Sequence, residues 1–177
     1  MASIAYLLRW WLAAELIGLC ALPLAWRVFR RLPDRGYGFA RALGLLLLTY
    51  ALWLGGTLGV LPFSAGSAVL ALAAVTLPGL VLFAREREAI FAWLIASKRY
   101  VLCCEAIFLG AMLLVAFLRS YQPAIAGTEK PFEYANYNAV TRSAAFAPTD
   151  PWLAGKPMAY YYLGYVAVSL ATPPTAT

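Results

Sequence analysis

The sequence predicts an all-α integral membrane protein with four transmembrane helices, the start of a fifth, and a long outer loop that contains a short helix. Of its 177 residues, 63% are hydrophobic and only 12% are charged. A soluble domain carries about 25% charged residues. The mean hydropathy is +0.74. Four long apolar runs, separated by short polar or basic stretches, are typical of a chain whose main solvent is lipid.

The residue composition excludes several kinds of site. The chain has no histidine, which excludes a histidine general base, a histidine-containing serine triad and a histidine metal ligand. The net charge of +6 comes from basic clusters between apolar runs, so we expect a lipid bilayer and no nucleic acid as partner. Cys20, Cys103 and Cys104 lie inside apolar runs and are interpreted as buried small side chains.

The first two apolar runs are interpreted as spans one and two. Residues 4–28 form the first span, and no signal-peptide cleavage site follows them. Residues 39–61 form the second span. The loop between the two spans is rich in arginine: Arg27, Arg30, Arg31, Arg35 and Arg41.

Two more spans follow a short uncharged turn. Residues 65–84 form the third span, with Pro78-Gly79 as an expected kink near its end. The charged segment 85–99 has an apolar middle, AIFAWLIA, that is too short to cross, because a crossing takes about 20 residues. We expect this segment to lie at the membrane interface as an amphipathic piece. Residues 100–118 form the fourth span.

The distribution of basic residues predicts a topology in the cell membrane. Segments 27–41 and 85–99 are both rich in arginine and are therefore predicted to be cytoplasmic. The N-terminus and residues 119–158 are then predicted to be non-cytoplasmic.

The end of the chain suggests an incomplete set of helices. A fifth apolar run from Met158 to Ala171 is too short to span alone, and Thr172-Pro173-Pro174 follows it. Glu15 and Glu105 lie inside spans and need partners that four helices are not expected to supply. We therefore expect the front part of a larger membrane protein. Three regions result: 1–118 with four spans, 119–158 outside the membrane, and 159–177 as the start of a further, truncated span.

The polar segment 119–158 is the predicted location of any chemistry. Pro131 suits the first turn of a helix over residues 131–142. Glu129 lies just before this helix and Glu133 in its first turn, so both carboxylates can point toward one small volume. Such a pair can share a divalent cation, Mg²⁺ or Mn²⁺, or provide a general base. Acids at a helix start also commonly serve only to stabilise the helix dipole.

Further side chains near these acids are candidates for substrate binding. Basic side chains of the segment could clamp a phosphate, and its turn carries an acid and a large aromatic ring. The tyrosines at 160–165 are typical of an aromatic belt at the membrane interface, and stacking on a sugar is the alternative. The candidates are Lys130, Asn138, Arg142, Asp150, Trp152 and Tyr161.

The strings GTEKPFEYANYNAVTRS and FAPTDPWLAGKPMAYYYLGY resemble the signature region of the YYY family of multi-pass membrane proteins. The pattern of that family is G-T-E-K-P-M-D, then N-A-hydrophobic-x-R-S, D-P-W-hydrophobic-x-G, and Y-Y-Y followed by a glycine. This sequence departs from it at Phe132 and at Glu133, where the pattern has aspartate. Glutamate keeps the charge but lengthens the side chain.

The resemblance implies a function. The YYY family is similar to the C-type glycosyltransferases (GT-C), which use a polyprenyl-phosphate sugar and carry acidic catalytic or metal-binding residues in their first large outer loop. Residues 119–158 occupy that place here. The resemblance therefore implies Glu129 and Glu133 as base or metal ligands, with Lys130 and Arg142 at the donor phosphate.

Two other functions fit the sequence. A non-catalytic scaffold or assembly subunit of the envelope predicts that the outer acids tolerate replacement. A transporter predicts paired charges inside spans, for which only Glu15 and Glu105 qualify.

Overall fold

A computed structural model, which describes residues 2–144 and 146–171, confirms the all-α membrane class. No strand occurs within those two ranges. The elements are α1 Ala2–Val28, η1 Tyr37–Phe39, α2 Ala40–Thr57, α3 Ala65–Ala96, α4 Lys98–Ser120, α5 Lys130–Arg142 and α6 Leu163–Ala171. Four stretches are long and apolar enough to cross a membrane: Ile4–Val28, Tyr37–Thr57, Ala65–Ala96 and Lys98–Ser120.

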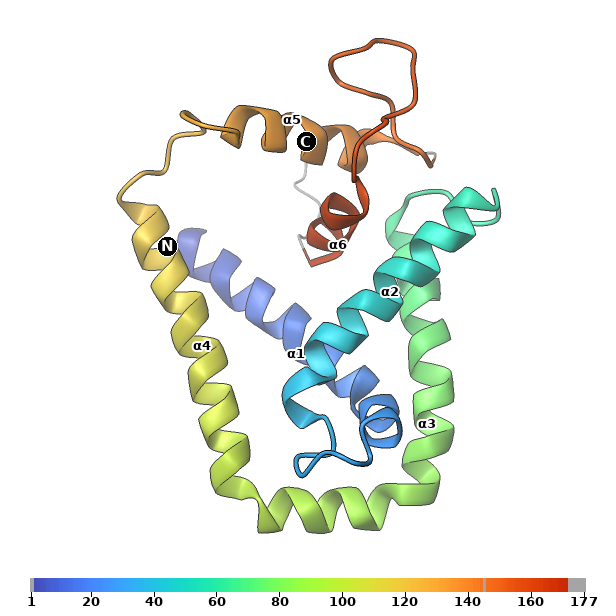
Figure 1. Cartoon of the computed structure of the whole chain (residues 1–177), viewed down its shortest axis with the longest axis vertical. Helices are drawn as coiled ribbons and strands as arrows, with labels where there is room; N and C mark the ends of the chain where they lie inside the picture. Colours follow the sequence, from blue (N-terminus) through green and yellow to red (C-terminus); the bar gives the residue numbers. More distant parts are fainter. Residues whose placement is uncertain (1, 145, 172–177) are drawn as a thin grey trace.

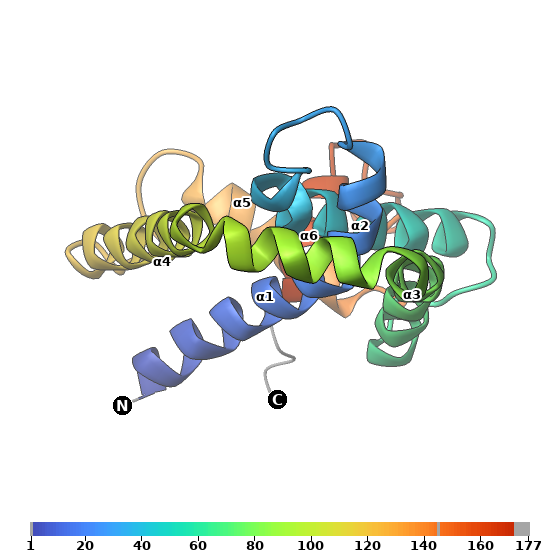
Figure 2. The same cartoon turned by 90° about the horizontal axis from the view of Figure 1, so that it is seen from below.

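The helices form an open frame (Figure 1). Helices α1 and α2 cross at the centre and pack against α3, which stands on one flank, and α4 stands on the opposite flank. Helix α5 lies across the upper end, and α6 descends beneath it toward α2. The yellow-green second part of α3 runs across the lower end, and Figure 2 shows it crossing the molecule from α3 to α4.

Helix α3 is longer than predicted. Its start is fixed by Ser64, whose side-chain oxygen accepts a hydrogen bond from the Ser67 backbone N–H at 3.2 Å. It then continues without a break to Ala96 and takes in most of the charged segment 85–99. The predicted separate interfacial piece is therefore the second part of α3, because Arg, Glu and Ala are good helix formers that extend the helix past the span.

Helix α2 ends at Thr57, earlier than the predicted residue 61. Gly59 adopts a left-handed backbone with φ of 72°, and the Val60 N–H donates to the Gly55 carbonyl at 2.9 Å. This is the bond of a Schellman cap, for which glycine is the favoured residue because it has no Cβ.

Small residues let α1 and α2 approach closely. A Cβ atom on Gly44 would lie 2.7 Å from the Ile17 carbonyl oxygen, so any larger residue would force the two backbones apart. The main core then joins α1, α2 and α3 to the outer helices. Its buried members are Ile17, Leu48, Leu52, Ala71, Val140 and Val166.

The outer elements are anchored on the upper end of α2. Val140 of α5 and Val166 of α6 are both fully buried in the main core. The Trp53 indole N–H donates to the Tyr162 hydroxyl at 3.1 Å, and the Phe63 N–H donates to the Ala144 carbonyl at 3.0 Å. The position of α5 relative to the spans is therefore fixed by packing and by hydrogen bonds.

The fifth apolar run is helical only from Leu163 to Ala171. Residues 160–162 precede this helix as non-helical chain. The expected stop at Thr172-Pro173-Pro174 lies outside the described residues.

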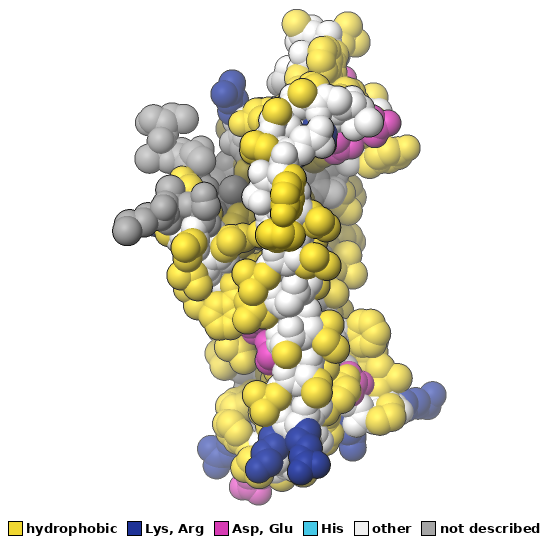
Figure 3. Space-filling view, turned by 90° about the vertical axis from the view of Figure 1, so that its left-hand side faces the viewer, with side chains coloured by type: hydrophobic (Ala, Val, Ile, Leu, Met, Phe, Trp, Pro, Cys, Tyr) yellow, Lys and Arg dark blue, Asp and Glu magenta, His cyan; other side chains and the backbone are white. Residues whose placement is uncertain are grey.

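The molecule has a basic end and an outer end. Arg27 at the end of α1 lies 3.7 Å from Glu86 in α3, which joins the two arginine-rich segments directly. The space-filling view shows a hydrophobic shaft, with Lys and Arg side chains gathered at its lower end (Figure 3). Residues 119–158 begin at the other end of α4. This arrangement is compatible with the prediction that both basic segments lie on one side of the membrane and residues 119–158 on the other.

Candidate functional site

The candidate site forms where the start of α5 meets the chain between α5 and α6. Helix α5 begins one residue earlier than predicted, with Pro131 in its first turn and Glu133 close behind. Pro131 favours this position because the first turn needs no intrahelical N–H donor. The predicted helix over residues 131–142 is thus confirmed.

Glu133 is held by a residue of α6. The Tyr165 hydroxyl donates to Glu133 Oε2 at 2.7 Å, and the Asn136 side-chain amide lies 3.5 Å from the same hydroxyl. Asn136 is only 1% exposed, so this contact provides its buried amide with a partner. The three side chains form a chain of polar contacts from the core to the surface carboxylate.

Glu129 is exposed and free to act on a ligand. It occupies the N-cap position of α5, yet its side chain accepts no capping hydrogen bond. In the part of the chain that the structure describes, its carboxylate has no ion-pair partner. Local burial and then the charges of Glu133 and Glu129 raise the pKa of the Tyr160 hydroxyl, so both acids act on the same side chain.

Aromatic rings from two segments pack together near these acids, with Tyr160 as the ring that both carboxylates act on. The Phe132 ring in α5 stacks on Trp152 with ring centres 6.1 Å apart and an interplanar angle of 15°. Tyr160 meets Phe132 edge-on at 5.1 Å, and Tyr161 lies 4.5 Å from Tyr160. Trp152 and Tyr161 are 64% and 81% exposed. Exposed rings beside carboxylates form a surface on which a sugar ring can stack.

Asp150 shapes the loop that carries Trp152. Its Oδ1 accepts the backbone N–H groups of Trp152 at 2.8 Å and Leu153 at 3.0 Å. Its own N–H donates to the Lys156 carbonyl at 2.9 Å, which closes the loop. Asp150 was predicted to bind substrate; its Oδ1 instead accepts the hydrogen bonds of an Asx turn that positions Trp152.

The structure separates three of the predicted binding residues. Lys130 and Arg142 are the first and last residues of α5, about 18 Å apart along a helix of this length. A single phosphate cannot contact both, which corrects the predicted clamp. Asn138 donates to the Tyr134 carbonyl of its own helix at 2.8 Å. With 100° per residue, Asn138 and Arg142 lie on the helix side away from Glu133.

The acids can provide two carboxylates to a metal ion. Within the described ranges, no group of three or more His, Cys, Asp or Glu side chains is placed to hold a metal. Mg²⁺ is commonly bound through one or two carboxylates together with waters and substrate phosphates. A cation on Glu129 and Glu133 would therefore need further ligands from water or from a substrate phosphate.

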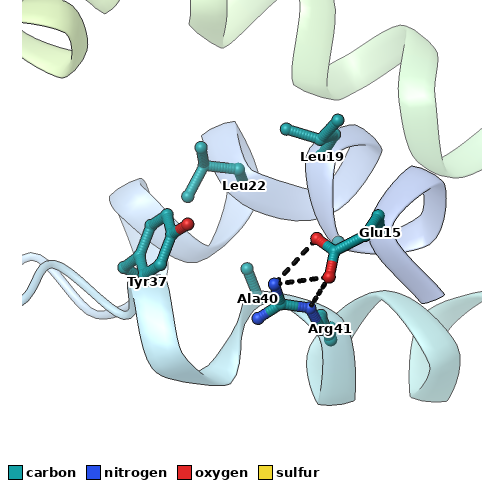
Figure 4. A pocket seen from close by; sticks show the side chains of 7 residues that line it. Glu15, Leu19, Leu22, Tyr37, Ala40 and Arg41 are labelled. Atoms are coloured by element: carbon teal, nitrogen blue, oxygen red, sulfur yellow. Dashed lines mark hydrogen bonds and ion pairs between the residues drawn. The ribbon is translucent and has the colours of Figure 1, made fainter. Parts of the chain in front are cut away.

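A second polar cluster lies inside the spans, and sequence reasoning missed it. Arg41 Nη2 donates to both oxygens of Glu15, at 2.7 Å to Oε2 and 2.8 Å to Oε1, and also to Glu105. The Tyr37 hydroxyl donates to Glu105 Oε1 at 2.5 Å. Figure 4 shows Glu15 and Arg41 facing each other, with Tyr37 beside them. The expectation that four helices could not supply partners for these acids is therefore wrong.

The position of Arg41 in the sequence could have indicated this cluster. It is the last arginine of the predicted loop, and α2 already begins at Ala40, so Arg41 belongs to the span. An open pocket lies beside it, with about 240 Å³ of empty space that includes open solvent. The pocket is lined by Glu15, Gly18, Leu19, Leu22, Tyr37, Ala40 and Arg41.

Comparison with known proteins assigns the chain at family level. Residues 47–177 match the family described as Uncharacterized membrane protein (DUF2298). The chain belongs to this family. The match to DUF2298 runs from within α2 to the end and includes the whole signature region, so the predicted membership of a multi-pass membrane protein family is confirmed. It also includes Glu105, whereas Glu15 and Arg41 precede it. No curated protein and no solved structure matches the chain.

Proposed function

We propose that this DUF2298 protein is a membrane-embedded glycosyltransferase of the C type that uses a lipid-linked sugar as donor. The observation that carries the proposal is the position of Glu129 and Glu133, one helical turn apart at the outer end of the apolar helices. Tyr160, on which both acids act, contacts the exposed ring of Tyr161, and Phe132 between the two acids stacks on the exposed ring of Trp152. Carboxylates next to stacking rings are suited to a sugar, and apolar helices are suited to a polyprenyl chain.

The reaction would transfer a sugar from a polyprenyl phosphate to a hydroxyl of the acceptor. The acceptor oxygen attacks the anomeric carbon of the sugar and loses its proton to a carboxylate. The bond between the anomeric carbon and the phosphate oxygen breaks, and polyprenyl phosphate leaves with the bonding electrons. Glu129 is the proposed base because its carboxylate is exposed and without a hydrogen bond in the described ranges.

The remaining residues would hold the reactants. Glu133, fixed by Tyr165, would orient the sugar through its hydroxyl groups. Lys130 starts the same helix and would contact the donor phosphate. Trp152 and Tyr161 would stack on the sugar. A Mg²⁺ or Mn²⁺ ion on the two carboxylates would supply charge neutralisation at the leaving phosphate.

The test is transfer of labelled sugar from a polyprenyl-phosphate donor to membrane glycans by the full-length protein, with and without a chelator. Replacing Glu129 with Gln should reduce transfer by about 100- to 10,000-fold, the range for loss of a general base, and replacing Glu133 with Gln should also reduce transfer because the sugar loses its orienting carboxylate. Loss of a helix-dipole acid alone would change stability by only about 0.3–1 kcal/mol.

The matched control is Glu88→Gln, which removes an exposed acid at the other end of the molecule. It should transfer sugar at the normal rate, and all three variants should insert into the membrane equally. Near-normal transfer by both outer Gln variants would reject the enzyme and favour the scaffold. Loss of function only with variants of Glu15, Arg41 or Glu105 would favour the transporter instead.

A further inference from the structure

The lower end of the molecule concentrates nearly all of its net charge. We define the basic end as residues 27–35 and 85–99. These two segments hold eight of the 14 Lys and Arg residues and three of the eight acids. They come from the end of α1 with the loop after it, and from the second part of α3 with the start of α4. The Arg27–Glu86 ion pair joins them.

An aromatic cluster fixes the geometry of the basic end. The Trp93 ring lies 5.7 Å from Trp26, 6.0 Å from Tyr37 and 6.2 Å from Tyr100, which come from three other elements. Ile90, one turn before it, is only 2% exposed. The second part of α3 is therefore packed against the bundle on one side and holds its other side chains outward in a defined array.

Two of the acids at the basic end are already engaged. Although burial alone would raise it, hydrogen bonds from the backbone of Gly36 and Gly38 and from the Tyr100 hydroxyl hold the pKa of Asp34 below its usual range. Glu86 is paired with Arg27. Only Glu88 remains exposed without an ion pair in the described part of the chain.

Six basic side chains at this end are exposed and have no acidic partner within the described ranges. They are Arg30, Arg31, Arg85, Arg87, Lys98 and Arg99; Arg35 is also exposed without an acidic partner, but its guanidinium lies over the Trp26 ring. Exposed apolar side chains lie among them, with Phe91 at 53% and Ile95 at 72%. Basic groups interleaved with apolar ones on a helix that crosses the end of a bundle are suited to a bilayer surface, where rings enter the acyl boundary and cations meet phosphates.

We propose that the basic end is a binding surface for anionic phospholipid headgroups. Its partner is the lipid of the leaflet that surrounds this end. The apolar side chains between the cations favour a lipid over a soluble polyanion, which would leave them exposed. This surface is independent of the proposed sugar transfer, because it lies at the opposite end from Glu129 and Glu133.

The experiment uses the full chain in nanodiscs of phosphatidylcholine with a minor share of phosphatidylglycerol. Native mass spectrometry identifies and counts the lipids that stay bound to the protein after it is released from the nanodisc. The wild type should retain phosphatidylglycerol well above its share, and high salt should weaken this preference. The variant Arg85→Gln/Arg87→Gln should lower the retention of phosphatidylglycerol on the order of tenfold, since each basic residue near a charged surface contributes about fivefold in affinity.

The control variant Arg142→Gln/Lys156→Gln removes the same charge at the outer end. It should retain phosphatidylglycerol as the wild type does. If the 85/87 variant melts early in pure phosphatidylcholine, Arg30→Gln/Arg31→Gln provides a second test on the loop. Absence of any preference in the wild type, or an equal loss in control and test variants, would overturn the proposal.

Discussion

The carboxylate of Glu133 gains its place from a hydroxyl that lies 32 residues further along the chain. Tyr165 donates to it and at the same time faces the buried amide of Asn136. A hydrogen bond to a charged group contributes about 1.5–3 kcal/mol. One phenolic oxygen therefore connects the inner packing of α5 to the acid at its surface.

Removing that oxygen should impair transfer without changing the fold. Tyr165→Phe keeps the ring but leaves Glu133 without its donor, and activity should fall roughly 10- to 100-fold. Rates measured over a range of donor concentrations should show the loss in kcat rather than in KM. Tyr134→Phe is the control, because no hydrogen bond involves its hydroxyl in the described ranges. Equal activity of the two variants would show that Tyr165 has no positioning role.

At the scale of elements, α4 differs from the other long helices. None of its residues is buried, and it follows α3 with few contacts to the bundle. Its ties to α2, to η1 and to the loop after α1 are polar: Glu105 binds Arg41 and Tyr37, and Tyr100 donates to Asp34. The Arg41 guanidinium also lies 4.5 Å from the Phe108 ring. Arg41 therefore makes two of the contacts that position α4, one with Glu105 and one with Phe108.

Arg41→Gln should loosen α4 and destabilise the protein. Glu15 and Glu105 would face each other without a cation, and breaking a buried pair on one side costs about 3–5 kcal/mol. Thermal unfolding in detergent and limited proteolysis of the α3–α4 connection measure the effect. The triple variant Glu15→Gln/Arg41→Gln/Glu105→Gln removes all three charges of the cluster and should recover part of the stability. The control Arg142→Gln should melt at the wild-type temperature. If Arg41→Gln melted at the wild-type temperature, Arg41 would have no role in stabilising the protein.

Local sequence patterns predicted the positions of the helices better than the contacts between helices. Apolar runs of about 20 residues identify spans, and Pro131 marks the start of α5, because both signals are local. The same local view treated Arg85 and its neighbours as a break, although charged residues continue α3. It could not pair Arg41 with Glu15 or Tyr165 with Glu133, which are 26 and 32 residues apart. Such pairs depend on packing between elements, not on spacing along one of them.

At the scale of the whole molecule, the two ends differ in charge and in chemistry. Both arginine-rich segments lie at one end, and α5 with its acids lies at the other. The positive-inside rule predicts that the basic end is cytoplasmic and that α5 lies on the opposite side of the membrane.

Cysteine labelling should confirm this orientation. In a version without Cys20, Cys103 and Cys104, single cysteines at Ser120 or Ala154 should react with an impermeant thiol reagent in intact cells. A cysteine at Ala89, exposed in the second part of α3, should react only after the membrane is opened. Labelling at Ala89 in intact cells, with Ser120 protected, would invert the topology.

The Glu15–Arg41 pair also constrains how the chain enters the bilayer during synthesis. A single charged side chain at the centre of a lone helix costs about 2.5–3.5 kcal/mol in lipid. Glu15 lies near the middle of α1 and Arg41 at the start of α2, so pairing between the two helices during insertion would offset part of the cost of placing Glu15 in lipid. The loop between α1 and α2 keeps the two helices next to each other during this step. We therefore predict that the first two helices enter the bilayer as a hairpin, to which α4 later adds Glu105.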